Sequence, residues 1–163
     1  MSLTPLKSRN YLPVYFIPNY FSLSVKNCKR NTFITMRLFT ESINTKKNPK
    51  TYSVLEQQLP SVFSSKCFNE QNLPFNEEVK NTEIGHLFEH ILLEYLCYYK
   101  LLSGSDEAIF NGNTNWNWER DEFGTFHISI DSGKDNNQIF SQAIEKSVSL
   151  LLEILQKDPS VIN

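Results

Sequence analysis

The stretch "NTEIGHLFEHILLEYLCYYKLL", residues 81–102, carries the strongest helical pattern in the chain. Its apolar residues recur at three- and four-residue intervals, which is the spacing of one face of an α-helix. Asn81 or Thr82 can serve as the N-cap, and Ser103–Gly104 is a typical stop signal. The sequence therefore predicts one long helix around which the rest of the fold is arranged.

Outside this helix, several segments are typical of β-strands. Residues 32–39 ("TFITMRLF") alternate with a period of two, and residues 124–131 ("GTFHISID") also predict a strand. Residues 14–25 mix aromatic and β-branched side chains around Pro18, which indicates an edge or bent strand. Residues 107–112 indicate a further short strand. The expected core face of the segment 32–39 carries Ile34, Met36 and Leu38.

Two more helices complete the predicted elements. Residues 52–63 have helical spacing with Pro60 bending or restarting the helix, and residues 138–156 form an amphipathic helix that Pro159 ends. The resulting order is strand, strand, helix, helix, strand, strand, helix. It predicts an α+β fold, a two-layer sandwich in which helices pack on an antiparallel sheet.

Length and composition are those of one ordinary globular domain. The chain has 163 residues, of which 40% are hydrophobic and 21% charged, and its formal net charge is -2. We expect residues 1–163 to form a single domain, with residues 1–12 as a loose leader. Because the Lys and Arg residues form no basic stripe, nucleic acid is not an expected partner. No apolar stretch is long enough to cross a bilayer, so no membrane association is expected.

Cysteine usage and the N-terminal residues bear on localisation. Cys28, Cys67 and Cys97 lack C-x-x-C spacing, so neither a disulfide framework nor a thiolate zinc site is indicated. The first residues are interrupted by prolines and contain no secretory signal. We therefore expect a reduced, cytoplasmic protein, and homo-oligomerisation stays open.

His86, Glu89 and His90 form an H-x-x-E-H set on the predicted helix 81–102. Residues four apart lie on one helix face, about 6 Å apart along the axis, so both imidazoles can reach one cation. Glu89 can then take a proton from a water molecule bound to that cation. The order H-x-x-E-H occurs in zinc peptidases. The pattern predicts a Zn²⁺ site with Glu89 as the catalytic base, against the alternative of a buried helix with two hydrogen-bonded histidines.

A catalytic zinc needs a third protein ligand, which the sequence does not identify. Glu94 continues the same face, but it lies about 9 Å from the expected level of the metal by helix rise. We expect Glu94 either to ligate the metal or, more naturally, to hydrogen-bond the far nitrogen of His90 and fix its tautomer. Other candidates are His127, then Glu119, Asp121 or Glu122, with Cys67 as a weaker option.

The segment "NTNWNWER" (113–120) contains the candidate substrate-binding residues. Trp116 and Trp118 could stack on a ligand, and Arg120 could bind a carboxylate. The alternative is that the tryptophans fold back onto the core and Arg120 is exposed.

These motifs together resemble the N-terminal domain of cyanophycin synthetase. That domain contains G-H-x-x-E-H-x-x-x-E, which Gly85, His86, Glu89, His90 and Glu94 match. The resemblance spans about residues 14–156. Further similar features, in the same order along the chain, are Pro18-Asn19-Tyr20-Phe21-Ser22, Leu59-Pro60, Cys67, Phe110, Gly112, Thr114 and Gly124-Thr125-Phe126.

The resemblance implies a metallopeptidase-like zinc site that cuts an aspartate–arginine polymer and generates primers for its extension. The family's elongation sites lie in ATP-grasp and Mur-ligase-like regions. These 163 residues contain no Gly-rich phosphate loop, so no synthetase activity is expected from them. The family's arginine-bearing segment is here "NGNTNWNWER" (111–120), which leaves the substrate preference open.

The leading hypothesis is a small zinc-dependent hydrolase of peptide or isopeptide amide bonds, with a cyanophycin-like polymer as a candidate substrate. The main alternative is a non-catalytic polymer-binding or assembly module without a catalytic metal. A third hypothesis is a small-molecule lyase that uses H-x-x-E-H with a cysteine ligand. It requires Cys67 or Cys97 at the metal, and Cys97 lies too far along the helix from His86.

Overall fold

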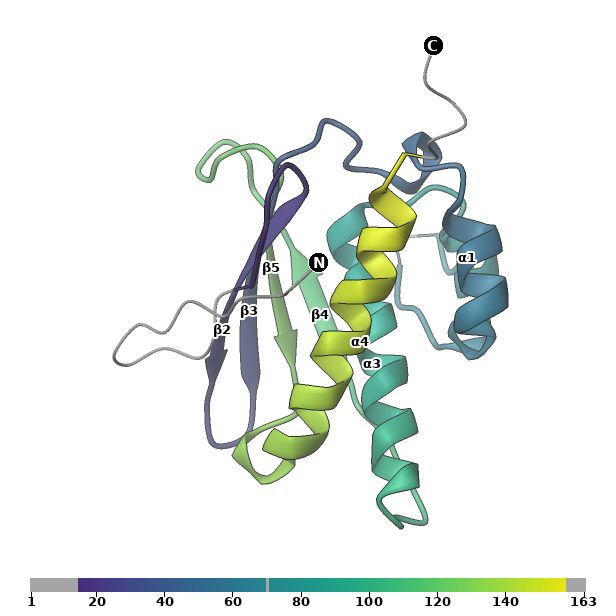
Figure 1. The fold of residues 1–163 in the computed structure, drawn as a ribbon, viewed down its shortest axis with the longest axis vertical. Coiled ribbons are helices and arrows are strands. Elements are labelled where there is room, and N and C mark those ends of the chain that lie inside the picture. The colour runs from purple at the N-terminus through teal and green to yellow at the C-terminus, as the bar shows by residue number, and fades with distance from the viewer. Residues whose placement is uncertain (1–14, 70, 158–163) are drawn as a thin grey trace.

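Five strands form one antiparallel sheet in the computed structural model, which describes residues 15–69 and 71–157. Their order across the sheet is β1-β2-β3-β5-β4, and every neighbouring pair is antiparallel (Figure 1). The leader expected at residues 1–12 lies outside the described residues. The strands are β1 (Tyr15–Ile17), β2 (Phe21–Asn27), β3 (Thr32–Leu38), β4 (Gly112–Asn115) and β5 (Thr125–Ile130).

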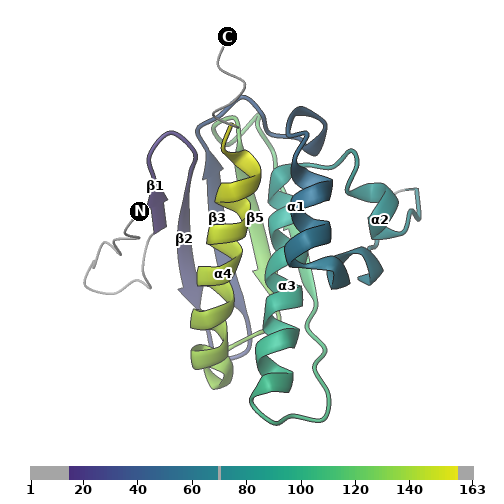
Figure 2. The same cartoon turned by 45° about the vertical axis from the view of Figure 1, so that its right-hand side comes forward.

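Helices cover one face of this sheet, which confirms the predicted α+β fold with an antiparallel sheet. In Figure 1 the sheet forms one layer and the helices the other. In the turned view of Figure 2, α3 and α4 run side by side, α1 crosses in front of the upper part of α3, and α2 lies beyond α3 on the side away from β1. The helices are α1 (Thr51–Gln58), α2 (Phe75–Glu78), α3 (Ile84–Leu102) and α4 (Asn137–Leu155).

The period-two alternation of the strands separates a core face from a solvent face. In β3, Ile34, Met36 and Leu38 are buried as predicted, because the side chains of alternate residues point to the same face. In β5, Phe126 and the residues two and four positions later are buried against the helices. His127 therefore lies on the opposite face of the sheet from α3.

The predicted bent strand 14–25 is in fact two strands joined by a tight turn. The Tyr20 amide donates to the Ile17 carbonyl at 3.0 Å, and Asn19 adopts a positive φ of 71°. Pro18 followed by a left-handed Asn is the signature of a type II turn, because proline presets the first position and asparagine tolerates the second. The chain therefore reverses where a single strand was expected.

The strand expected at residues 107–112 was also misplaced. β4 occupies Gly112–Asn115, a segment of Gly, Asn and Thr with low intrinsic strand propensity. It forms because it pairs with β5, Asn113 opposite Ser129 and Thr114 opposite Ile128. Tertiary pairing thus places Thr114 next to α3.

The start of α3 differs from the prediction as well. Glu83 is the N-cap and contributes no side-chain cap, whereas the Thr82 hydroxyl lies 2.8 Å from Nδ1 of His86. Gly85 packs directly on β5, since a Cβ added there would lie 2.3 Å from Cγ of Phe126. The glycine therefore allows a close helix–sheet contact that fixes the height of the first turn of α3.

The other predicted helices are close to their expected positions. The helix predicted at 52–63 divides at Pro60 into α1 and a short 3₁₀ helix, Pro60–Ser64. The loop predicted at 66–80 contains the single-turn helix α2. Within the described residues, none of the helices combines the length and the apolarity that crossing a membrane requires.

Candidate metal centre

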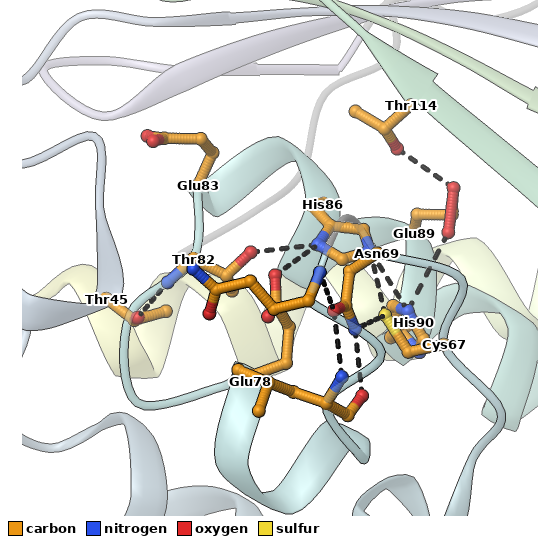
Figure 3. Close-up of polar contacts among 12 residues, drawn as sticks. Thr45, Cys67, Asn69, Glu78, Thr82, Glu83, His86, Glu89, His90 and Thr114 are labelled. Carbon is orange, nitrogen blue, oxygen red and sulfur yellow. Dashed lines mark hydrogen bonds and ion pairs between the residues drawn. The ribbon is translucent and has the colours of Figure 1, made fainter.

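Three potential ligand atoms converge at the N-terminal half of α3 (Figure 3). The Nε2 atoms of His86 and His90 lie 3.2 Å apart, and Sγ of Cys67 lies 3.6 Å from Nε2 of His86. All three atoms lie within 4.8 Å of one another. The two histidines come from successive turns of one helix, and Cys67 comes from the loop that precedes α2. The three residues are close enough together to hold one metal ion.

The spacing of these atoms fits tetrahedral zinc. With bonds of about 2.0 Å to nitrogen and 2.3 Å to sulfur, two tetrahedral nitrogen ligands stand roughly 3.3 Å apart. A nitrogen and a sulfur ligand then stand roughly 3.6 Å apart. The separations of 3.2 Å and 3.6 Å agree with both values. The third separation, between Sγ of Cys67 and Nε2 of His90, lies within 4.8 Å.

The hydrogen bonds of His90 leave its Nε2 lone pair free. Oγ of Ser65 donates its single proton to the Val62 carbonyl at 2.7 Å. The same oxygen lies 2.9 Å from Nδ1 of His90, so at this contact it can only accept. His90 is therefore protonated on Nδ1, which is the tautomer that presents Nε2 to a metal.

His86 has a matching environment. Its Nδ1 lies 2.8 Å from the Thr82 hydroxyl and 3.9 Å from a carboxylate oxygen of Glu78. The carboxylate is too distant for a hydrogen bond, but its negative charge favours a proton on Nδ1, which the Thr82 hydroxyl can accept. Two Nε2 lone pairs then face each other at 3.2 Å. Such an arrangement is repulsive unless a cation lies between the rings.

Burial keeps both imidazoles uncharged. Desolvation lowers the pKa of His86, and desolvation together with the neighbouring His86 lowers the pKa of His90 to about 3. Phe75 from α2 stacks on the His90 ring, with centroids 3.9 Å apart. Neutral imidazole is the metal-binding form. Burial raises the pKa of the Cys67 thiol, so a metal must displace the thiol proton.

Glu89 lies beside the three ligand atoms without belonging to the set. Its side chain is buried, one oxygen accepts a hydrogen bond from Thr114 Oγ1 at 3.1 Å, and the other lies 3.9 Å from Nε2 of His90. Gly112 makes room for its stem, because a Cβ there would lie 3.0 Å from Cγ of Glu89. Burial raises the pKa of Glu89 to about 7, and the Thr114 hydrogen bond opposes this rise.

Two clefts meet at these residues. One, of about 510 Å³, extends toward Glu78 and the N-terminus of α3, and the other, of about 620 Å³, extends along Leu93. Phe68, His86 and Thr114 line both. Phe68 is 93% exposed, so it stands at the mouth rather than in the core. A chain-like molecule could thus pass the metal ligands on both sides.

Glu94 does not have either of the roles expected for it. Its carboxylate accepts a hydrogen bond from Ser61 Oγ at 2.8 Å, and it is not part of the Cys67–His86–His90 group. The partner of His90 Nδ1 is Ser65 instead. The reason is the helix rise, which carries Glu94 one turn beyond the metal ligands toward the 3₁₀ helix Pro60–Ser64.

His127 is also away from the cluster. Its Nε2 lies 2.8 Å from a carboxylate oxygen of Asp121, and its side chain leaves the sheet on the face opposite α3. Glu122 forms an ion pair with Arg37 on that same solvent face. Neither His127 nor the acidic-loop candidates Glu119, Asp121 and Glu122 belong to the Cys67–His86–His90 group, and the strand parity of β5 explains the position of His127.

The expected substrate-binding residues turn out differently. Trp118 donates its indole N–H to the Thr125 carbonyl at 2.9 Å and packs edge-on against Phe126, so it belongs to the fold. Arg120 is exposed, and neither it nor Trp118 lines the two clefts. Trp116, the other tryptophan expected to stack on a ligand, lines the cleft beside His86.

Sequence reasoning ranked Cys67 below the acidic candidates, yet Cys67 is the residue that joins the two histidines. No spacing rule links a loop cysteine to a helix that begins seventeen residues later at Ile84. The available signal was its place in the resemblance, as the cysteine upstream of the motif helix. The lyase hypothesis asked for Cys67 or Cys97 at the metal, and Cys67 meets that requirement.

Comparison with known proteins shows no family for this chain. No protein-family model matches the chain, and no curated protein matches it significantly in sequence. The arrangement of Cys67, His86, His90 and Glu89 therefore carries the functional argument.

Proposed function

We propose that this protein is a zinc-dependent hydrolase of amide bonds in a peptide or isopeptide chain. Cys67, His86 and His90 hold the zinc ion, and Glu89 is the general base and then the general acid. The observation that carries the proposal is the pair of separations, 3.2 Å between the imidazole nitrogens and 3.6 Å between nitrogen and sulfur, beside a buried carboxylate.

Zinc at this position would supply a Lewis acid that lowers the pKa of a water molecule and polarises the amide carbonyl. With zinc bound, Glu89 would take a proton from water on the oxygen that lies 3.9 Å from His90 Nε2. Thr114 holds the other oxygen at 3.1 Å and so orients the carboxylate. Glu89 then delivers the proton to the leaving nitrogen. Ser65 and Thr82 keep the imidazole rings in place.

The clefts on both sides of His86 favour a chain over a small molecule. An extended substrate placed with its scissile amide at the zinc would leave one part in each cleft. An aspartate–arginine polymer is one candidate substrate, and the sequence resemblance to the N-terminal domain of cyanophycin synthetase supports it. The cysteine ligand favours the lyase hypothesis. The two open clefts do not, because a small substrate needs one enclosed pocket.

The test combines metal analysis with one matched pair of variants. Protein purified without chelator should contain about one zinc ion per chain. Glu89→Gln should keep the zinc and lose amide cleavage of a peptide or aspartate–arginine polymer by about 10²-fold or more, because it removes the proton carrier. Glu94→Gln, whose partner is Ser61, should retain both properties.

Other results would point elsewhere. Stoichiometric zinc without any amide cleavage in the wild-type protein would favour a binding or assembly module with a structural metal. Absence of any bound divalent metal would remove the hydrolase altogether. Equal cleavage by wild type and Glu89→Gln would show that the base is another group.

A further inference from the structure

β4 lies at one edge of the sheet and has a partner on only one side. Among the described residues it pairs with β5, and the sheet order ends with it. An edge strand carries a row of backbone N–H and C=O groups without strand partners, and such a row can template the pairing of another extended chain. This edge adjoins the candidate metal centre, since Thr114 of β4 donates to Glu89.

The hydrogen-bond pattern shows which backbone groups face outward. The Asp131 amide donates to the Asn111 carbonyl at 3.0 Å, so these two facing residues form a hydrogen-bonded pair. Such pairs alternate along an antiparallel ladder, which makes Asn113 and Asn115 the next hydrogen-bonded positions. The N–H and C=O groups of Gly112 and Thr114 consequently point away from β5, to the free edge.

Those two residues also line the clefts. Gly112 and Thr114 both border the larger cleft, and Thr114 borders the smaller one together with His86. Phe68 stands on the wall of both clefts. A strand added to the edge of β4 would therefore lie in these two clefts, beside Glu89 and the candidate metal ligands Cys67, His86 and His90.

We propose that the substrate is an extended α-peptide that binds as an extra β-strand on the edge of β4. Its backbone hydrogen-bonds Gly112 and Thr114 while one of its amide bonds lies over Cys67, His86 and His90. This inference rests on the proposed hydrolase and specifies its substrate. Because Gly112 and Thr114 are two residues apart, the peptide must span at least about three residues to bond with both.

A second copy of this chain is the other occupant that such an edge could take. Pairing of β4 with β4 of another copy would use the same backbone groups and would cover both clefts at their common wall. A substrate strand also explains why the outward N–H and C=O groups of Gly112 and Thr114 lie beside Glu89. Dimerisation gives no reason for that position. Self-association is therefore an outcome that the test must exclude.

The first experiment measures amide protection in the inactive, zinc-loaded Glu89→Gln protein. The probe is the tightest-binding hexapeptide selected from a random-sequence library. Hydrogen exchange followed by NMR should show new protection of the Gly112 and Thr114 amides on binding, and little change at Asn113 and Asn115, which already pair with β5. Protection of all four, of none, or of residues elsewhere would overturn the inference, as would a library that yields no binder.

The second experiment uses Thr114→Pro and Thr114→Val in the same background. Both remove the hydroxyl, and only proline also removes the outward N–H without breaking a bond to β5. We expect proline to weaken hexapeptide binding about tenfold relative to valine, the effect of one lost hydrogen bond. Equal binding by the two folded variants contradicts the proposal. If the proline variant does not fold, N-methylation of single hexapeptide amides tests the same bonds.

Two outcomes separate this inference from the hydrolase itself. Protection of Gly112 and Thr114 by the peptide without zinc uptake would refute the hydrolase and leave the edge as a peptide-binding surface. Zinc-dependent cleavage without edge protection would refute only the strand addition. Protection of the same two amides without peptide, together with a dimeric mass, would assign the edge to self-association.

Discussion

Sγ of Cys67 lies 3.6 Å from Nε2 of His86, so a loop residue completes the ligand set that a helix begins. The histidines share α3, whereas the cysteine reaches them from the segment between the 3₁₀ helix Pro60–Ser64 and α2. This contact separates the present site from a plain two-histidine helix. It also makes the role of each cysteine testable.

Replacing Cys67 with Ser should abolish tight zinc binding, because the thiolate supplies the third ligand. Replacing Cys97 with Ser should not, since its Sγ contacts the Ala108 carbonyl at 3.5 Å. Cobalt substitution provides the measurement. Wild type and Cys97→Ser should show a sulfur-to-cobalt charge-transfer band in the near ultraviolet, and Cys67→Ser should lack it. An unchanged band in Cys67→Ser would exclude the thiolate as a ligand.

Zinc binding should release about one proton per ion near pH 6 in the Glu89→Gln protein, because a zinc-bound water with a pKa of about 7 keeps its proton there. Burial raises the pKa of Cys67, so its thiol is protonated before binding, while the lowered pKa values of His86 and His90 leave both rings neutral. Calorimetric titration in buffers of different ionisation enthalpy counts the protons. Release of none would indicate that Cys67 does not ligate as a thiolate.

Glu89→Gln should stabilise the metal-free protein at alkaline pH. Folding raises the pKa of Glu89 from 4.5 to about 7, so the stabilising contribution of its protonated form is full below pH 4.5 and is lost as pH rises through 7. At about pH 8 the buried charge costs on the order of 3 kcal/mol, which glutamine avoids. Thermal unfolding at pH 8 and at pH 4.5 measures the difference. A stabilisation equal at both pH values would refute this account.

Gly85→Ala should destabilise the fold by about 1–3 kcal/mol, the usual cost of overpacking. The added Cβ would meet the Phe126 ring at 2.3 Å, so helix or strand must move. Phe126→Leu in the same protein should recover part of the loss by clearing space. Denaturant unfolding of the two single variants and the double variant measures the coupling between the two positions. Additive effects would show that the contact does not restrict the helix.

Much of the fold could be predicted from local pattern. β3 and α3 each have one buried face, so their apolar residues recur at strand and helix spacing in the sequence. β4 could not be found in this way, because its Gly and Asn residues become a strand only through pairing with β5. The turn at Pro18–Asn19 was missed although both residues favour it.

The candidate site was predictable to the same extent. His86 and His90 were found because helix geometry alone brings residues four apart together. Glu94 was expected near His90 on the same reasoning, but the rise of the helix carries it to Ser61. Cys67 and Thr114 reach the site through the packing of a loop and an edge strand. Such long-range contacts follow from the whole fold rather than from any local spacing.

The close packing of Gly85 against Phe126 has a practical consequence for protein engineering. It anchors the first turn of α3, and with it the imidazole pair, to the sheet, whereas the sulfur is carried by the loop between the 3₁₀ helix Pro60–Ser64 and α2. A designer could therefore keep Ser65 on Nδ1 of His90, graft alternative loops at positions 66–69 and screen them for a preference for iron, cobalt or copper. The histidine half of the site would serve every member of such a library unchanged.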